Sequence, residues 1–123
     1  METKFLINKH LTPKQLERLS VLGSESDPVI FALVGDLSGR GEYSESAIAF
    51  TACELIVPPT EEGEEETRIR YEDIDNIYAK RMYGNALIRV KMKGETRARN
   101  LYRYTFGIAA LCDAAIRFVK GVM

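Results

Sequence analysis

The sequence predicts a mainly β protein in which about seven short antiparallel strands form a strongly bent sheet, and one long C-terminal helix closes its open end. Two observations predict this fold class. Short apolar or alternating segments follow one another from residue 29 to residue 104, separated by glycine, proline and acidic turns. A single amphipathic segment with helical spacing then covers 105–121. Strands in succession with one closing helix are typical of a bent sheet with a plugged end.

The length and composition indicate one domain over residues 1–123. At 13.9 kDa with 46% hydrophobic residues, the chain is large enough to bury a core without staples. The longest apolar run, 29–34, is far shorter than a membrane span, and the first residues lack the apolar region of a signal peptide. We therefore expect a protein that is not secreted. Cys53 and Cys112 are expected to be reduced, buried thiols, with a disulfide as the alternative.

A helix near the N-terminus is predicted by several local signals that agree. Residues 1–10 have no clear period, and we expect a flexible arm there. Thr12 and Gln15 have the spacing of a capping box, and Gly23 is expected to end the helix. Leu11 and Leu16 have the positions of a hydrophobic staple, and Leu16 and Leu19 form one apolar stripe with Leu22 alongside. With its caps, the predicted helical segment is 11–23.

Seven segments between residues 29 and 104 have strand-like patterns. The predicted strands are Val29–Leu37, Tyr43–Thr51, Cys53–Val57, Arg68–Tyr71, Ile74–Met82, Ala86–Lys93 and Thr96–Tyr104. The cleanest alternation is in the sixth, where apolar residues alternate with Arg89, Lys91 and Lys93. This pattern predicts a half-buried strand with a basic outer face. In the seventh segment, Arg97, Arg99, Leu101 and Arg103 are expected on one side.

Charge is distributed unevenly, although the formal net charge is only −1. Residues 42–66 carry eight acids and no base, whereas residues 68–103 carry ten bases against four acids. Such an asymmetry indicates a dipolar module that docks on a charged partner surface. The alternative is two sheets whose solvent faces differ in sign and neutralise each other. The bases that we predict for a docking face are Arg89, Lys91, Lys93, Arg97, Arg99 and Arg103.

No set of residues has the spacing of a catalytic, nucleotide or metal site. The glycine-rich stretch 35–41 lacks the lysine and hydroxyl of a phosphate loop, and a strand follows it instead of a helix. One histidine and two separate cysteines cannot form a zinc ligand set, and the glutamates of 61–66 lack calcium-loop spacing. Ser44 and Ser46 have no nearby base in sequence. We expect no cofactor, no metal and no enzyme activity.

Several motifs together resemble bacterial pleckstrin-homology-like (PH-like) domains. These motifs are Gly35-Asp36-Leu37, Gly41-x-Tyr43, Phe50-Thr51 and Ile69-x-Tyr71-x-Asp73-Ile74-x-x-Ile77, followed by the closing amphipathic helix. The resemblance covers about residues 11–121 and departs from the pattern at 47–49, where two alanines replace bulkier strand residues. It implies a half-open barrel of two orthogonal antiparallel sheets. More narrowly, the pattern is similar to the soluble N-terminal domain that precedes the membrane region of some bacterial ABC exporters.

The narrower resemblance implies a non-catalytic cytoplasmic accessory domain of a bacterial ABC-type transport ATPase, at the inner face of the cell membrane. Its partner would be the rest of the transporter polypeptide or a second copy of itself. The alternative is a free-standing PH-like module that oligomerises or associates with anionic membranes. A phosphoinositide site is expected to be missing, because the first hairpin, 36–43, carries only Arg40 beside Glu42. The pI near 5.9 argues against nucleic acid as a partner.

Overall fold

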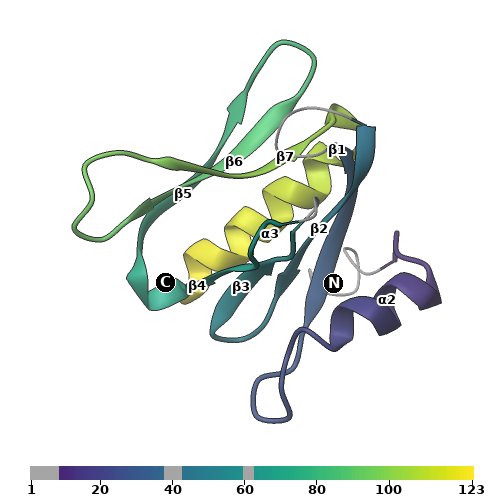
Figure 1. Ribbon diagram of the computed structural model, residues 1–123. Helices are drawn as coiled ribbons and strands as arrows, with labels where there is room; N and C mark the ends of the chain where they lie inside the picture. The colour runs from purple at the N-terminus through teal and green to yellow at the C-terminus, as the bar shows by residue number, and fades with distance from the viewer. Residues whose placement is uncertain (1–8, 38–42, 60–62) are drawn as a thin grey trace.

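The computed structural model describes residues 9–37, 43–59 and 63–123, which form two antiparallel sheets and two α-helices (Figure 1). The first sheet has the order β1-β2-β3-β4, with β1 Phe31–Leu37, β2 Tyr43–Phe50, β3 Glu54–Val57 and β4 Thr67–Arg70. The second has the order β5-β6-β7, with β5 Ile74–Arg81, β6 Ala86–Met92 and β7 Arg99–Tyr104. The helical elements are α2 Pro13–Ser20, α3 Ala109–Val122 and the short turns η1 Tyr71–Asp73 and η2 Phe106–Ile108.

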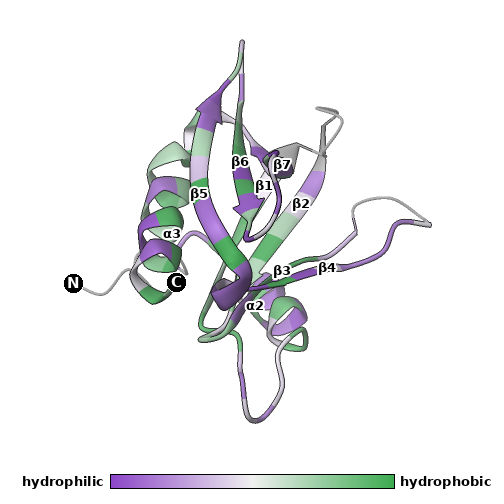
Figure 2. Cartoon of the chain, turned by 90° about the vertical axis from the view of Figure 1, so that its left-hand side faces the viewer, coloured by the Kyte–Doolittle hydropathy of each residue, from purple (hydrophilic) through white to green (hydrophobic). Residues whose placement is uncertain are grey.

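The main core lies between the two sheets and is closed by α3, as predicted (Figures 1 and 2). Helix α3 contributes Cys112, Ala115, Ile116 and Val119 to this core, which are the buried positions of its amphipathic face. The strands contribute alternate residues of both sheets, because successive side chains of a strand point to opposite faces. The described residues therefore confirm the mainly β, helix-closed barrel.

A second, smaller core lies on the outer face of the first sheet, where α2 covers β1 and β2. Leu11 and Leu19 pack there on Ala32, Ala47 and Ala49. Small side chains on a strand allow a helix to approach the sheet closely. The alanines at 47–49, which depart from the PH-like pattern, therefore make room for α2. Strand β1 is covered on both faces, as its apolar sequence predicts.

The N-terminal helix has the predicted capping box but a different end. Thr12 Oγ1 accepts the Gln15 N–H at 3.1 Å, and Gln15 Oε1 accepts the Thr12 N–H at 2.9 Å. Leu16, expected in the apolar stripe, is 37% exposed, and the helix ends at Ser20 instead of reaching residue 23. Gly23 is not a left-handed cap. A Cβ at Gly23 would lie 2.7 Å from the Val29 backbone nitrogen, so close chain approach requires the glycine.

Several strand boundaries also differ from the prediction. Tyr71, expected to end the fourth strand, begins η1, where its hydroxyl donates to the Thr51 carbonyl at 2.8 Å. A buried tyrosine needs such a partner. The strand ends here because the chain turns, with the Ile74 N–H donating to the Tyr71 carbonyl. The seventh strand begins at Arg99, not at residue 96. Three segments named from the sequence lie partly outside the described residues: the arm 1–10, the first hairpin 36–43 and the glutamate-rich segment 61–66.

The two cysteines have different environments, and the prediction that both are buried is wrong for Cys53. Cys112 is fully buried on the inner face of α3, whereas Cys53 is exposed in the bend before β3, and both are free thiols. Burial raises the pKa of the Cys112 thiol, and the neighbouring Asp113 raises it further. Because the thiolate is the nucleophile, Cys112 is protected at neutral pH by both its pKa and its burial.

We therefore expect an aromatic disulfide reagent to label one thiol per folded molecule near pH 8, and two in denaturant. The fast thiol is Cys53, so Cys53→Ser should abolish labelling of the folded protein. Absorbance of the released chromophore measures the stoichiometry. Rapid labelling of both thiols in the folded state would contradict the core position of Cys112.

Candidate functional site

Three of the six bases predicted for a docking face lie on the outer side of the β5-β6-β7 sheet. Arg89 and Lys91 alternate on β6 with buried residues, and their neighbours on β5 are Tyr78 and Asn76. Arg103 on β7 lies opposite Leu87 of β6. Directly opposed residues of antiparallel strands share a face. Arg103 therefore belongs to the same outer face as Arg89 and Lys91.

A β-bulge places Arg99 on the other side of this sheet. The register of β6 and β7 shifts between Ile88 and Arg89, so that Leu101 has no direct partner and Arg99 lies opposite Val90. Val90 is completely buried on the inner side. One extra residue reverses the alternation, because the side-chain period of a strand is two. The expectation that residues 97–103 present one basic side is therefore wrong.

Local contacts already occupy several of the predicted docking bases. Lys91 Nζ lies 2.8 Å from Asp75 Oδ2, and the guanidinium of Arg99 binds both carboxylate oxygens of Glu95 at 2.9 and 3.0 Å. The Lys91 ammonium holds the pKa of Asp75 below its usual range. Arg89 Nη2 donates to the Ala98 carbonyl at 3.2 Å. The Lys91–Asp75 pair links β6 to β5 and reduces the net charge of the outer face, whereas the contacts of Arg89 and Arg99 brace the connection between β6 and β7.

Two further bases, Lys80 and Arg81, lie at the opposite end of this sheet, next to the β5–β6 turn. We define the hairpin tip as Lys80, Arg81, Met82 and Tyr83, with Phe106 and Arg103 beside it. The tip projects beyond the rest of the chain (Figure 2). Among the described residues, no carboxylate pairs with Lys80 or Arg81.

The side chains of the hairpin tip are held by a tight turn and by two contacts. Gly84 adopts φ +83°, and Met82 N–H donates to the Asn85 carbonyl at 2.8 Å. Arg103 Nη1 donates to Asn85 Oδ1 at 2.7 Å. The guanidinium of Arg81 stands 5.5 Å from the centroid of the Phe106 ring. The turn therefore orients an apolar end between basic flanks.

Tyr83 and Met82 were not among the residues that sequence patterns singled out. Residues 83–85 predict a hairpin turn, and that turn is confirmed. Tyr83 is fully exposed, and Met82 is 40% exposed. One signal in the sequence could have pointed to Tyr83. Tight turns favour glycine, asparagine and aspartate over aromatic residues, so a tyrosine in this turn is unusual.

Two clefts among the described residues border the first sheet. A cleft of about 280 Å³ lies between α2 and the first sheet and includes Arg18, Glu45 and Pro58. Arg18 Nη2 lies 2.7 Å from Glu45 Oε1, and this contact lowers the pKa of the Glu45 carboxyl. A smaller cleft of about 150 Å³ separates β2 and β3 from β7. Neither cleft contains a convergent pair of acid–base groups.

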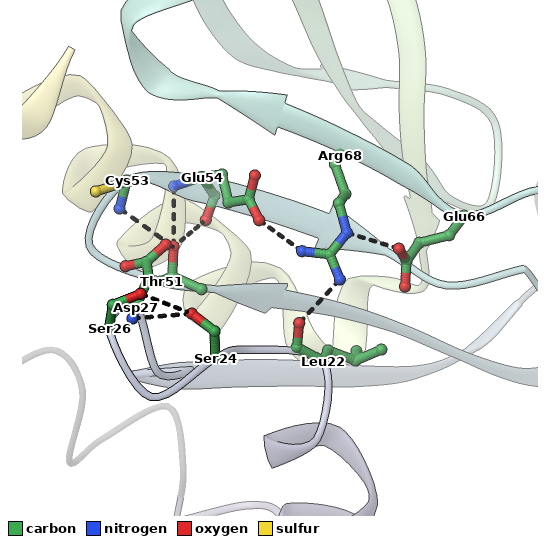
Figure 3. Close-up of polar contacts among 9 residues, drawn as sticks. All are labelled: Leu22, Ser24, Ser26, Asp27, Thr51, Cys53, Glu54, Glu66 and Arg68. Carbon is green, nitrogen blue, oxygen red and sulfur yellow. Dashed lines mark hydrogen bonds and ion pairs between the residues drawn. The ribbon is translucent and has the colours of Figure 1, made fainter.

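The densest polar cluster joins the linker after α2 to the β2–β3 turn (Figure 3). Thr51 Oγ1 donates to Asp27 Oδ2 at 2.7 Å and accepts the N–H groups of Cys53 and Glu54 at 3.1 and 2.9 Å. Arg68 of β4 binds Glu54 at 2.6 Å and also binds Glu66 and the Leu22 carbonyl. The polar groups of this cluster use their hydrogen-bonding capacity on one another, as expected for a cluster with a structural role.

A metal site is not present either in the part of the chain that the structure describes, where no group of three or more histidine, cysteine, aspartate or glutamate side chains lies close enough to hold an ion. Over the same residues, none of the helices is both long and apolar enough to span a bilayer.

A four-stranded and a three-stranded antiparallel sheet around one core, closed by a C-terminal helix, define the PH-like fold. The solved structures include a similar one: a DUF1696 family protein with a pleckstrin-homology domain from Shewanella loihica PV-4. The TM-score is 0.52 at 13% identity, over 83% of this chain and 91% of that one. This likeness shows the fold alone. No protein-family model and no curated protein sequence gives a significant match.

Proposed function

We propose that the chain is a non-catalytic PH-like binding module that docks through the β5-β6-β7 sheet onto a negatively charged surface. The observation that carries this proposal is the charge of that sheet. The chain from 74 to 104, which forms this sheet, has eight bases against two acids, and Lys80 and Arg81 at the hairpin tip form no ion pair among the described residues. Clusters of unneutralised charge raise association rates with surfaces of opposite sign.

The proposed setting is the cytoplasmic accessory domain of a bacterial ABC-type transport ATPase, at the inner face of the cell membrane. The motif resemblance at 35–37 and 69–77 supports this setting. The partner surface would then be another part of the transporter polypeptide or a second copy of the chain. Arg89, Lys91, Lys93, Arg97, Arg99 and Arg103 remain the proposed protein-docking bases, with Arg99 reaching the partner from the sheet edge.

The reading frame that follows residue 123 tests the transporter setting. We expect it to encode apolar spans of about 20 residues, long enough to cross a bilayer. A phosphate loop with the pattern G-x-x-x-x-G-K-[ST] should follow, because the ATPase needs it. Sequencing of the native gene measures both features. A frame that contains neither would rule this setting out and leave the docking module itself intact.

A free-standing module at anionic membranes is the second candidate. It is favoured by the exposure of Met82, Tyr83 and Phe106 close to unneutralised bases. Light scattering and vesicle sedimentation on the isolated chain distinguish it, at low salt where electrostatic attraction is strongest. A monomer that ignores anionic vesicles would contradict it.

A further inference from the structure

We infer that the hairpin tip is a membrane-contact element, which places Tyr83 and Met82 in the interface of an anionic lipid bilayer while Lys80 and Arg81 meet the head groups. This inference deepens the proposed function, on which it rests, by naming the negatively charged surface. It also assigns the contact to a site different from the predicted docking bases Lys91, Lys93 and Arg97.

The first argument is the exposure of apolar side chains at the tip. Tyr83 is fully exposed, Met82 is 40% exposed and Phe106 is 46% exposed, all near one end of the second sheet. The turn itself requires only Gly84 and Asn85. Folding therefore does not explain an aromatic residue and a methionine at this point. Apolar side chains that gather on a projecting element mark a contact with another apolar phase.

The second argument is charge. The segment 78–88, which builds the tip, contains the bases Lys80 and Arg81 and no acid, and the segment 100–107 of the neighbouring strand adds Arg103 and no acid. Lys80 and Arg81 flank the apolar end directly, and Arg103 is bound to Asn85 of the turn. A basic collar around an apolar end is complementary to anionic head groups above an acyl layer.

The third argument is shape, which favours a bilayer over an acidic protein partner. The hairpin stands out from the body of the molecule (Figures 1 and 2). Protein hot spots cluster at the centre of a packed patch with surrounding contacts that exclude water. A narrow protruding tip lacks such surroundings, whereas a bilayer can enclose it from all sides. Tyrosine suits this position because its ring is apolar and its hydroxyl remains hydrated.

The absence of tryptophan from the sequence provides a direct test. Tyr83→Trp introduces a single fluorophore at the tip, and Thr96→Trp introduces one at the exposed connection between β6 and β7 as a matched control. Both variants are titrated with vesicles of phosphatidylglycerol and phosphatidylcholine in equal parts, and with pure phosphatidylcholine. We expect a blue shift and protection from an aqueous quencher for Tyr83→Trp with anionic vesicles only. Thr96→Trp should not shift.

Charge variants separate the tip from general electrostatic adsorption. Lys80→Glu/Arg81→Glu should weaken vesicle binding by roughly 30-fold or more, since each base near an anionic surface contributes about a fivefold factor. Lys93→Glu/Arg97→Glu changes the net charge equally at the far end of the sheet and should have a much smaller effect. Tyr83→Ser tests the apolar contribution with an expected loss of roughly tenfold. Circular dichroism confirms that each variant is folded.

Three results would overturn the inference. Vesicle binding without a shift of Tyr83→Trp would show adsorption through another basic surface, and would leave the docking function standing. Equal losses for the two charge-reversal pairs would show an unspecific charge effect. A shift of Tyr83→Trp that rises with protein concentration without lipid would assign the tip to contact with a second copy. None of these vesicle experiments tests the proposed transporter setting, which is tested only by the reading frame that follows residue 123.

Discussion

Phe31→Ala is expected to lower the free energy of unfolding by about 3–5 kcal/mol, the range for a large aromatic residue lost from a core. Phe31 is 1% exposed in β1. Its ring stacks on Phe50 with centroids 4.6 Å apart and meets the Phe118 ring edge to face at 4.9 Å. It therefore joins two strands of the first sheet to the closing helix. Alanine would remove both ring contacts and leave a cavity where α3 seals the barrel.

Urea denaturation followed by circular dichroism measures this effect, with an unchanged dependence on urea if the folded state keeps its compactness. Phe106→Ala is the matched control, because Phe106 is 46% exposed and contacts the Arg81 guanidinium at the surface. Its expected cost is below about 1 kcal/mol. Equal losses for the two variants would contradict the position of Phe31 in the core.

Thr51→Val is expected to cost about 2–3 kcal/mol, although the two side chains have nearly the same shape. Thr51 is fully buried at the end of β2. Its hydroxyl donates to Asp27 and accepts the N–H groups of two residues of the following turn (Figure 3). Valine would leave a carboxylate and two backbone donors without this partner. The cost arises from unpaired polar groups and not from lost packing.

Two controls separate these causes. Thr51→Ser keeps the hydroxyl and should retain most of the stability. Ser26→Ala removes an exposed hydroxyl that hydrogen-bonds the Ser24 hydroxyl at 3.2 Å (Figure 3), and its effect should remain within about 0.5 kcal/mol. Thermal unfolding measures the series. If Thr51→Ser destabilised as much as Thr51→Val, the methyl group and not the hydroxyl would be responsible.

The candidate site was only partly predictable. Alternation in β6 correctly placed Arg89 and Lys91 on an outer face, because strand periodicity is a local property of the chain. The bulge at Leu101 was not predictable, since register depends on the partner strand. The pairing of Lys91 with Asp75 joins two strands 16 residues apart, and the chain alone does not reveal which base meets which acid. The hairpin tip at Tyr83 could be recognised as basic only after the structure showed which bases of the second sheet form ion pairs.

The sequence by itself determined the fold class, the capping box at Thr12, the hairpin turn at residues 83–85 and the helix that closes the barrel. These features follow from short-range chemistry: side-chain periodicity, capping hydrogen bonds and turn-forming residues. Tertiary structure alone decided that Cys53 is exposed, that Gly23 is needed for close chain approach, and that a basic and apolar tip projects from the second sheet. These features depend on which distant segments meet, and that is settled by packing of the whole chain around its two cores.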